Sequence, residues 1–198
     1  MMRKYWIACS MAAGLLWIPG LAQQPATAPA SPPPPPPPCT ENCMSKEAQG
    51  NYARVKANIL KSADKMPAEE YSFKPTPDIR TFARVLNHVT EAQLHVCEAV
   101  NQSGSKVGDL VAHKEPAVPP ETADKATIVA ALSASFSECD KAYASLTDAN
   151  ITDMIQAGPV KRSRLGLLWG NASHDNEQYA TLALYLRLKG LVPPSSEK

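Results

Sequence analysis

The chain has 198 residues, of which 20 are Lys or Arg and 19 are Asp or Glu, so its formal net charge is +1 at pH 7. This balanced charge, without a long basic run, excludes a nucleic-acid-binding protein, which needs a clustered basic surface. About 150 residues remain when the two ends are set aside, enough for one domain with its own hydrophobic core.

Residues 1–22 have the pattern of a secretory signal peptide. Arg3 and Lys4 supply the positive start, an apolar stretch follows, and small residues precede a cleavage point after Ala22. The alternative is an uncleaved membrane anchor, but the apolar stretch is short for a spanning helix and is interrupted by Pro19-Gly20. We therefore expect an exported protein, periplasmic or secreted, without stable membrane insertion after cleavage.

Residues 23–44 are expected to form a proline-rich, disordered linker, because they include an unbroken run of prolines at 32–38. Such a run favours the extended polyproline II conformation and buries little apolar surface. It could act as a semi-rigid tether or as a ligand for a proline-binding module, and the tether is the simpler interpretation. The folded domain is then expected over residues 45–196.

All five cysteines except Cys9 follow the expected signal peptide: Cys39, Cys43, Cys97 and Cys139. Export would permit disulfides, and four cysteines allow three pairings, among which the sequence does not choose. A bond between Cys97 and Cys139 would staple two predicted helices and leave Cys39 and Cys43 to pair. Alternatively, Cys97 and Cys139 are small buried thiols. A four-cysteine zinc site is disfavoured because no Cys-x-x-Cys spacing is present.

Apolar side chains recur at spacings of three and four, which predicts amphipathic helices over about 45–66, 77–100, 122–146 and 163–189. Thr76 is expected to cap the second of these helices, and Gly190 to end the fourth. No segment shows the alternation of a strand. The expected fold class is therefore all-α, a four-helix bundle.

Histidines are the residues best placed for chemistry: His88, His95, His113 and His174. His113 falls in the long connection at 103–121 and is expected to be exposed. His88 and His174 border the apolar stripes of the second and fourth helices, and Gln178 follows His174 by one turn on the same face. Helical bundles hold metals with side chains from facing helices, so these three residues form a candidate metal site.

The alternative is that His88 and His174 are hydrogen-bonded structural residues. Glu91, Asp175 and Glu177 are carboxylates close to them in sequence. The chain contains none of the common catalytic motifs, such as His-Glu-x-x-His, Gly-x-Ser-x-Gly or the phosphate-binding loop. No catalytic residue is therefore assigned from the sequence.

Two stretches resemble DinB-like proteins, and the similarity is to exported bacterial members. Residues 71–82 and 86–89, the latter reading Leu-Asn-His-Val, resemble the start of their second helix. Residues 173–179 and 185–196 resemble their last helix and tail. The two matches occur in the right order, and the resemblance covers nearly all of the expected folded domain.

The resemblance implies a four-helix bundle of unusual connectivity with a divalent metal, zinc or nickel, held by three histidines. One lies on the second helix and two lie four residues apart on the fourth. His88 and His174 match two of these positions, but Gln178 stands at the third. An amide is a weaker donor than imidazole, so we expect weak metal binding or none. His95 is too far along its helix to replace the missing ligand, although Glu91 or a water could.

Some DinB-like proteins are thiol S-transferases that use low-molecular-weight thiols, others are thought to be metal-dependent hydrolases, and many dimerise. The resemblance therefore implies an exported metal-dependent enzyme of one of these types, acting on a small thiol or another small substrate, with a homodimer as a further expectation. The alternative is a non-catalytic binding or structural module that has lost the metal, which the glutamine at position 178 favours.

Overall fold

The computed structural model describes residues 38–102, 118–157 and 159–197. The expected signal peptide, most of the expected linker and His113 lie outside the described residues. The described chain is mostly helical, and it contains these elements in order: α1 (Cys43–Lys65), the 3-10 turn η1 (Ala68–Glu70), α2 (Phe82–Asn101), α3 (Lys125–Ala144), β1 (Met154–Ala157), β2 (Val160–Ser163), α4 (Arg164–Leu188) and the 3-10 turn η3 (Pro194–Ser196).

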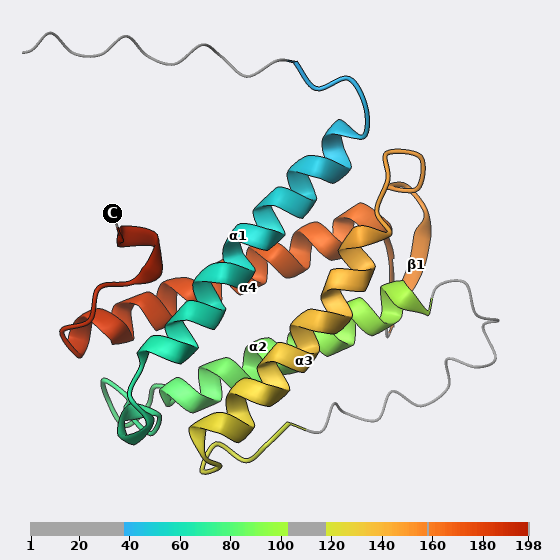
Figure 1. Cartoon of the computed structure of the whole chain (residues 1–198). Coiled ribbons are helices and arrows are strands. Elements are labelled where there is room, and N and C mark those ends of the chain that lie inside the picture. The colour runs from blue at the N-terminus through green and yellow to red at the C-terminus, as the bar shows by residue number, and fades with distance from the viewer. Residues whose placement is uncertain (1–37, 103–117, 158, 198) are drawn as a thin grey trace, which may run out of the picture. The chain divides into compact units, whose positions relative to one another are not determined.

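The four long helices form two crossing layers. In Figure 1, α1 and α3 lie in front, and α2 and α4 lie behind them. Helix α1 packs on α4 and α3, while α2 packs on α3 and α4, so every long helix has two helical neighbours. The predicted four-helix bundle is therefore confirmed, and its back layer places α2 directly against α4.

The predicted start of the second helix is wrong. Helix α2 begins at Phe82, and Thr81 caps it by accepting a hydrogen bond from the amide of Arg84 at 3.0 Å. The residues that follow Thr76 form a turn instead. The amide of Phe82 donates to the carbonyl of Phe73 at 2.9 Å, which satisfies one of the free N–H groups of the first helical turn.

A β-hairpin precedes α4, which corrects the expectation that the chain has no strand. Strands β1 and β2 are antiparallel and pair Ile155 with Arg162 and Ala157 with Val160. Ile155 and Ala157 are buried, while Met154 and Val160 are exposed. Each strand has four residues, too few for a clear alternation of apolar and polar side chains. The hairpin packs on α2 and places Arg162 close to the start of α4.

Helix α4 has the ends that its sequence predicts. Ser163 caps its first turn by accepting a hydrogen bond from the amide of Gly166 at 3.1 Å. A Cβ atom on residue 166 would lie 2.8 Å from the Ser163 hydroxyl, so the cap requires glycine there. At the other end Gly190 adopts a φ of 74°, and the amide of Leu191 donates to the carbonyl of Leu186 at 2.9 Å.

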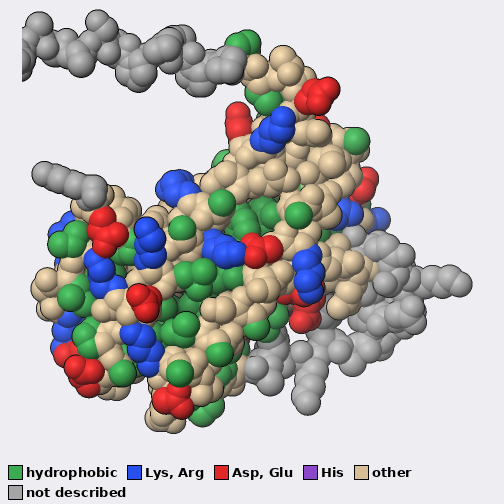
Figure 2. Space-filling model, viewed as in Figure 1, with side chains coloured by type: hydrophobic (Ala, Val, Ile, Leu, Met, Phe, Trp, Pro, Cys, Tyr) green, Lys and Arg blue, Asp and Glu red, His purple; other side chains and the backbone are tan. Residues whose placement is uncertain are grey.

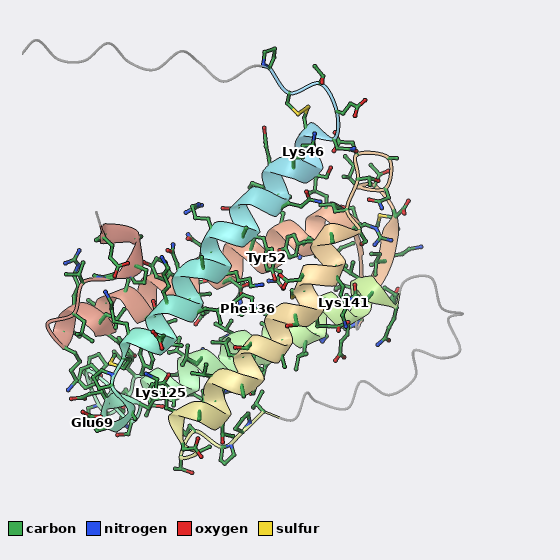
Figure 3. All side chains as sticks on the ribbon, viewed as in Figure 1. Lys46, Tyr52, Glu69, Lys125, Phe136 and Lys141 are labelled. Atoms are coloured by element: carbon green, nitrogen blue, oxygen red, sulfur yellow. A yellow bond between two sulfur atoms is a disulfide. The ribbon has the colours of Figure 1, made fainter. Side chains whose placement is uncertain are left out.

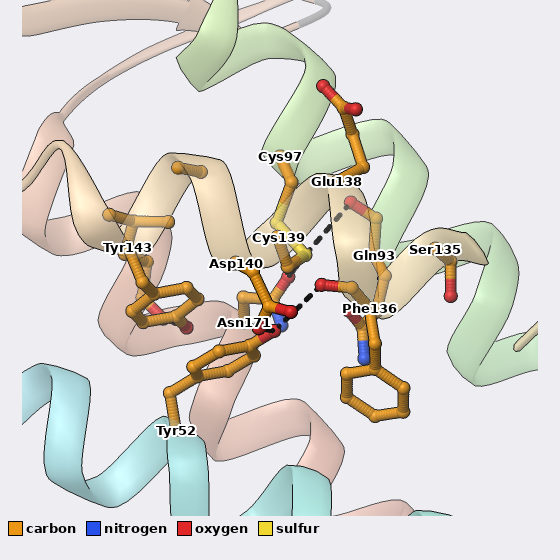
Figure 4. The surroundings of a disulfide bond; sticks show 12 residues. Tyr52, Gln93, Cys97, Ser135, Phe136, Glu138, Cys139, Asp140, Tyr143 and Asn171 are labelled. Carbon is orange, nitrogen blue, oxygen red and sulfur yellow. Dashed lines mark hydrogen bonds between the residues drawn. A yellow bond between two sulfur atoms is a disulfide. The ribbon is translucent and has the colours of Figure 1, made fainter. Parts of the chain in front are cut away.

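Of the three cysteine pairings that the sequence left open, the structure contains Cys97 with Cys139 and Cys39 with Cys43. Cys97–Cys139 joins α2 to α3 inside the core, where both residues are fully buried, and Figure 4 shows Gln93 and Asn171 beside it. Cys39–Cys43 joins two residues only four positions apart, at the start of α1. The first bond fixes two helices relative to each other, whereas the second is local.

Helices α1 and α3 are joined by aromatic and charged contacts on the face shown in Figure 2, where apolar side chains gather along the middle. The ring of Tyr52 stacks on Tyr143 with centroids 3.8 Å apart. Its hydroxyl lies 3.0 Å from the carbonyl oxygen of Phe136 and 2.9 Å from Oδ1 of Asp140, so the two acceptors share its single proton, and Lys56 pairs with the same carboxylate at 2.6 Å. Figure 3 shows Tyr52 and Phe136 between the two helices.

None of the helices in the described ranges combines the length and the apolar character that crossing a lipid bilayer requires.

Candidate metal centre

His88 of α2 and His174 of α4 face each other in the back layer of the bundle. Their Nε2 atoms are 3.1 Å apart, and the two rings meet edge to face with centroids separated by 4.9 Å. Both side chains are partly exposed, at 28% and 29%. The structure thus brings together two residues that lie 86 positions apart and that the sequence analysis singled out.

Each histidine also has a carboxylate on its other side. Nδ1 of His88 lies 3.6 Å from Oε2 of Glu91, and Nδ1 of His174 lies 3.8 Å from Oδ1 of Asp175. A carboxylate beside Nδ1 favours the tautomer with its proton on Nδ1 and its lone pair on Nε2. With both rings in that form, two lone pairs face each other, and a cation between them would satisfy both.

Glu91 is itself held in place by an arginine on the same helix. The guanidinium of Arg84 donates two hydrogen bonds to the two carboxylate oxygens of Glu91, at 2.9 and 3.1 Å. Bidentate pairs of this kind are among the most directional side-chain contacts. The carboxylate beside His88 is therefore fixed in position rather than free to swing into solvent.

The electrostatic surroundings keep His88 in the neutral form that binds metals. Burial lowers the pKa of His88, and the positive charge of Arg80 and the neighbouring His174 lower it further, while Glu91 acts in the opposite direction. A metal ligand must have a free lone pair, which a protonated imidazole lacks. At neutral pH the Nε2 atom of His88 can therefore serve as a ligand.

Asp175 is fully buried behind His174, and its carboxylate takes part in an interior network. Its Oδ2 atom accepts hydrogen bonds from Gln93 at 3.2 Å and from Asn171 at 2.9 Å. Burial raises the pKa of Asp175, although its contacts with His174 and Asn171 act against this rise. Its Oδ1 atom and Nδ1 of His174 are both buried and have no hydrogen-bond partner among the described residues.

Gln178 follows His174 by one turn of α4 and is 9% exposed. Its amide makes no hydrogen bond with any other residue in the described part of the chain, unlike Gln93, which binds Asp175. Neither its amide nitrogen nor its amide oxygen is fully shielded from solvent, so a ligand would only have to replace water there. This side chain is therefore available to a ligand.

The other candidates from the sequence lie in different surroundings. His95 is exposed on α2 and Glu177 is exposed on α4, so neither is placed like the facing pair. The network of Gln93, Asn171 and Asp175 was not predicted from the sequence. A polar residue inside an apolar stripe, as Gln93 is, was the signal that could have revealed it.

The facing pair fits a divalent metal in its geometry. Two imidazole nitrogens, each about 2.0–2.1 Å from a tetrahedral zinc ion, are separated from each other by about 3.3 Å. The 3.1 Å between the two Nε2 atoms is close to that value. Over the described residues no three His, Cys, Asp or Glu side chains are grouped to hold a metal, so a third ligand from these residues would be of another type, such as Gln178.

These features define a class: a four-helix bundle with a facing pair of histidines between its second and fourth helices. A family model of the DinB superfamily matches residues 51–182, and the chain belongs to this superfamily. The resemblance to DinB-like proteins, predicted from residues 71–82, 86–89, 173–179 and 185–196, is thereby confirmed.

Solved structures support the same fold. The chain is similar to a DinB-like protein from Bacillus cereus ATCC 10987, with a TM-score of 0.58 and 16% identity over 75% of this chain and 95% of that one. It is also similar to a DinB-like protein from Bacillus subtilis, with a TM-score of 0.56 and 13% identity over 73% of this chain and 92% of that one. No curated protein matches the chain.

Proposed function

We propose that this protein is an exported metal-dependent enzyme whose divalent ion, zinc or nickel, is bound by His88, His174 and Gln178. The observation that supports this function is the facing pair of Nε2 atoms at 3.1 Å, each on a ring whose Nδ1 atom lies within 3.8 Å of a carboxylate oxygen. Metal-binding histidines commonly have a carboxylate in that position. The unpaired amide of Gln178 gives the site a third, weaker ligand.

The residues around the site have separate tasks in this proposal. A bound divalent ion supplies Lewis acidity and lowers the pKa of a bound thiol or water, which makes it a better nucleophile. Glu91 and Asp175 orient the two imidazoles, and Arg84 fixes Glu91. The reaction we propose is of thiol S-transferase or hydrolase type, with a small thiol or water attacking a small substrate.

Metal content tests this function directly. The purified protein, equilibrated with zinc or nickel and freed of unbound ions, should carry about one ion per chain, as measured by elemental mass spectrometry. His88→Ala should reduce this content strongly because it removes one of two imidazoles. His95→Ala, which removes an exposed histidine of the same helix, is the matched control and should leave it unchanged. Absence of bound metal from the parent protein would contradict the proposal.

The alternative is a non-catalytic binding or structural module that has lost the metal. The observation that favours it is the side chain at position 178, because no third His, Cys, Asp or Glu completes the site within the described ranges. If Gln178→His binds metal tightly and the parent binds none, the module is the better interpretation. If the parent turns over thiol or ester substrates in a metal-dependent way, the enzyme is the better interpretation.

A further inference from the structure

A cavity of about 200 Å³ lies beside His174, where α2, α4 and β2 meet. This volume corresponds to about seven water molecules at liquid density, so it fits a small molecule or one end of a larger one. Its walls are mostly apolar. They include Gly170, which lies on α4 one turn before His174. Small-molecule sites commonly combine apolar walls with a few directed polar groups.

Arg162 of β2 supplies the one charged side chain that lines this cavity within the described ranges. Its Nη1 and Nη2 atoms lie 3.7 and 3.9 Å from the position that a Cβ atom on Gly170 would occupy. The guanidinium therefore lies across α4 at residue 170, one turn from His174. Glycine leaves space between the guanidinium and the helix that a larger side chain would fill.

The guanidinium of Arg162 has no hydrogen bond or ion pair with another residue among those that the structure describes. Nearby arginines of the chain are engaged: Arg84 binds Glu91, and Arg164 lies 3.8 Å from Asp153. Asn171, the other polar residue of the cavity wall besides His174, donates to Asp175 in the interior. Arg162 is exposed, so its guanidinium is open to solvent and can meet an anion at the cavity, whose lining in the described ranges includes no acidic side chain.

The charge of the neighbouring site agrees with an anionic ligand. His88, His174 and Gln178 are neutral donors, so they would leave the charge of a bound divalent ion uncompensated. Glu91 is paired with Arg84, and Asp175 is bound from the interior by Gln93 and Asn171. A substrate that carries a negative group would therefore be attracted to this cavity.

We propose that the cavity binds the carboxylate of a small substrate, with Arg162 as the residue that recognises it. The planar guanidinium matches a carboxylate through two parallel hydrogen bonds, and the apolar wall accommodates a short carbon chain. The adjoining atoms of the substrate then lie next to His174. The place of this subsite in a reaction rests on the proposed function, but carboxylate binding itself does not require the metal.

Titration of metal-free protein with 3-(methylthio)propionate tests the proposal, with two-dimensional NMR of the backbone amides as the readout. A thioether avoids exchange with the disulfides. We expect saturable chemical-shift changes at Arg162, Gly170 and His174. The affinity for the uncharged amide 3-(methylthio)propanamide should be at least about tenfold lower than that for the carboxylate. Arg162→Gln should weaken carboxylate binding by a similar factor, and Gly170→Leu should abolish it by filling the cavity.

Lys161→Gln is the matched control, because it removes the same charge from the adjacent position of β2, outside the cavity lining. It should leave the affinity for the carboxylate unchanged. The proposal is overturned if the parent protein shows no saturable shifts, if the carboxylate and the amide bind equally, or if Arg162→Gln binds as the parent does. Metal content of the same variants separates the two proposals: Arg162→Gln should keep its metal, and failure of the parent to bind metal would leave carboxylate binding by Arg162 intact.

Discussion

Two adjacent faces of α4 differ in how their polar groups are satisfied. On the interior face, Asp175 accepts hydrogen bonds from Asn171 and from Gln93, beside the buried disulfide. On the other face, which carries His174 and Gln178 and is called the groove face below, the Nε2 atom of His174 meets only another histidine, and the amide of Gln178 has no partner among the described residues. Polar groups bound by protein stabilise the fold, whereas polar groups left unbound are available to a ligand. Substitutions should separate these roles.

The largest loss of stability is expected from removal of the interior disulfide. Its two cysteines are 42 positions apart and fully buried. Closing a loop of that length stabilises a protein by about 4 kcal/mol in the chain-entropy description. The double variant Cys97→Ala, Cys139→Ala should therefore lose about 3–4 kcal/mol in free energy of unfolding, as measured by urea denaturation monitored with circular dichroism.

The second disulfide provides the matched control for this prediction. Cys39 and Cys43 are four positions apart at the start of α1, so their bond restricts little of the unfolded chain. The double variant Cys39→Ala, Cys43→Ala should lose about 2 kcal/mol in the same description, half of the loss expected for the buried bond. Equal losses for the two double variants would show that the buried bond does not act as a staple between α2 and α3.

A smaller loss is expected from Asp175→Ala. The substitution removes the shared acceptor of Gln93 and Asn171, and it leaves two buried amide donors without a partner. An unsatisfied buried donor costs about 1–3 kcal/mol, so the free energy of unfolding should fall by about 2 kcal/mol. Asp175→Asn keeps an acceptor oxygen and removes a buried charge, and it should lose less than half as much. A fully stable alanine variant would contradict the assignment of Asp175 to the stabilising face.

On the groove face, Gln178→His should change ligand binding rather than stability. An imidazole is a stronger donor for zinc or nickel than an amide oxygen, so metal affinity should rise about tenfold or more, measured by competition with a chelating dye. The free energy of unfolding of the metal-free protein should change by less than about 1 kcal/mol. Gln93→His, on the interior face, should instead destabilise the protein without a gain in affinity.

The fold was predictable because its signals are local and repeated. Apolar residues spaced three and four positions apart predicted all four helices, and Ser163 and Gly190 marked the ends of the last one. The start of α2 was not predictable in this way. Thr76 and Thr81 are equally suitable caps in sequence, and the choice depends on a tertiary hydrogen bond from Phe82 to Phe73. The hairpin escaped because four-residue strands contain too little periodicity.

The candidate site was predictable only in part, for a related reason. His88 and His174 were identified from their positions at the edges of apolar stripes and from the family resemblance, and the structure brings their Nε2 atoms together. Arg162 was missed because it reaches the site from the hairpin, whose register no sequence pattern indicated. The interior network was missed because Gln93 occupies a position in the apolar stripe of the second helix. Its pairing with Asp175 depends on the packing of α2 on α4.

The smallest effect on stability is expected from His88→Ala in metal-free protein. The imidazole is partly exposed, and water can take the place of its contact with His174, so the loss should stay below about 1 kcal/mol. The difference should appear when metal is added. Binding to the native state alone raises the thermal midpoint of the parent protein, whereas the variant should show little shift. A large loss without metal would show that the groove face also stabilises the fold, and the contrast between the two faces of α4 would then not hold.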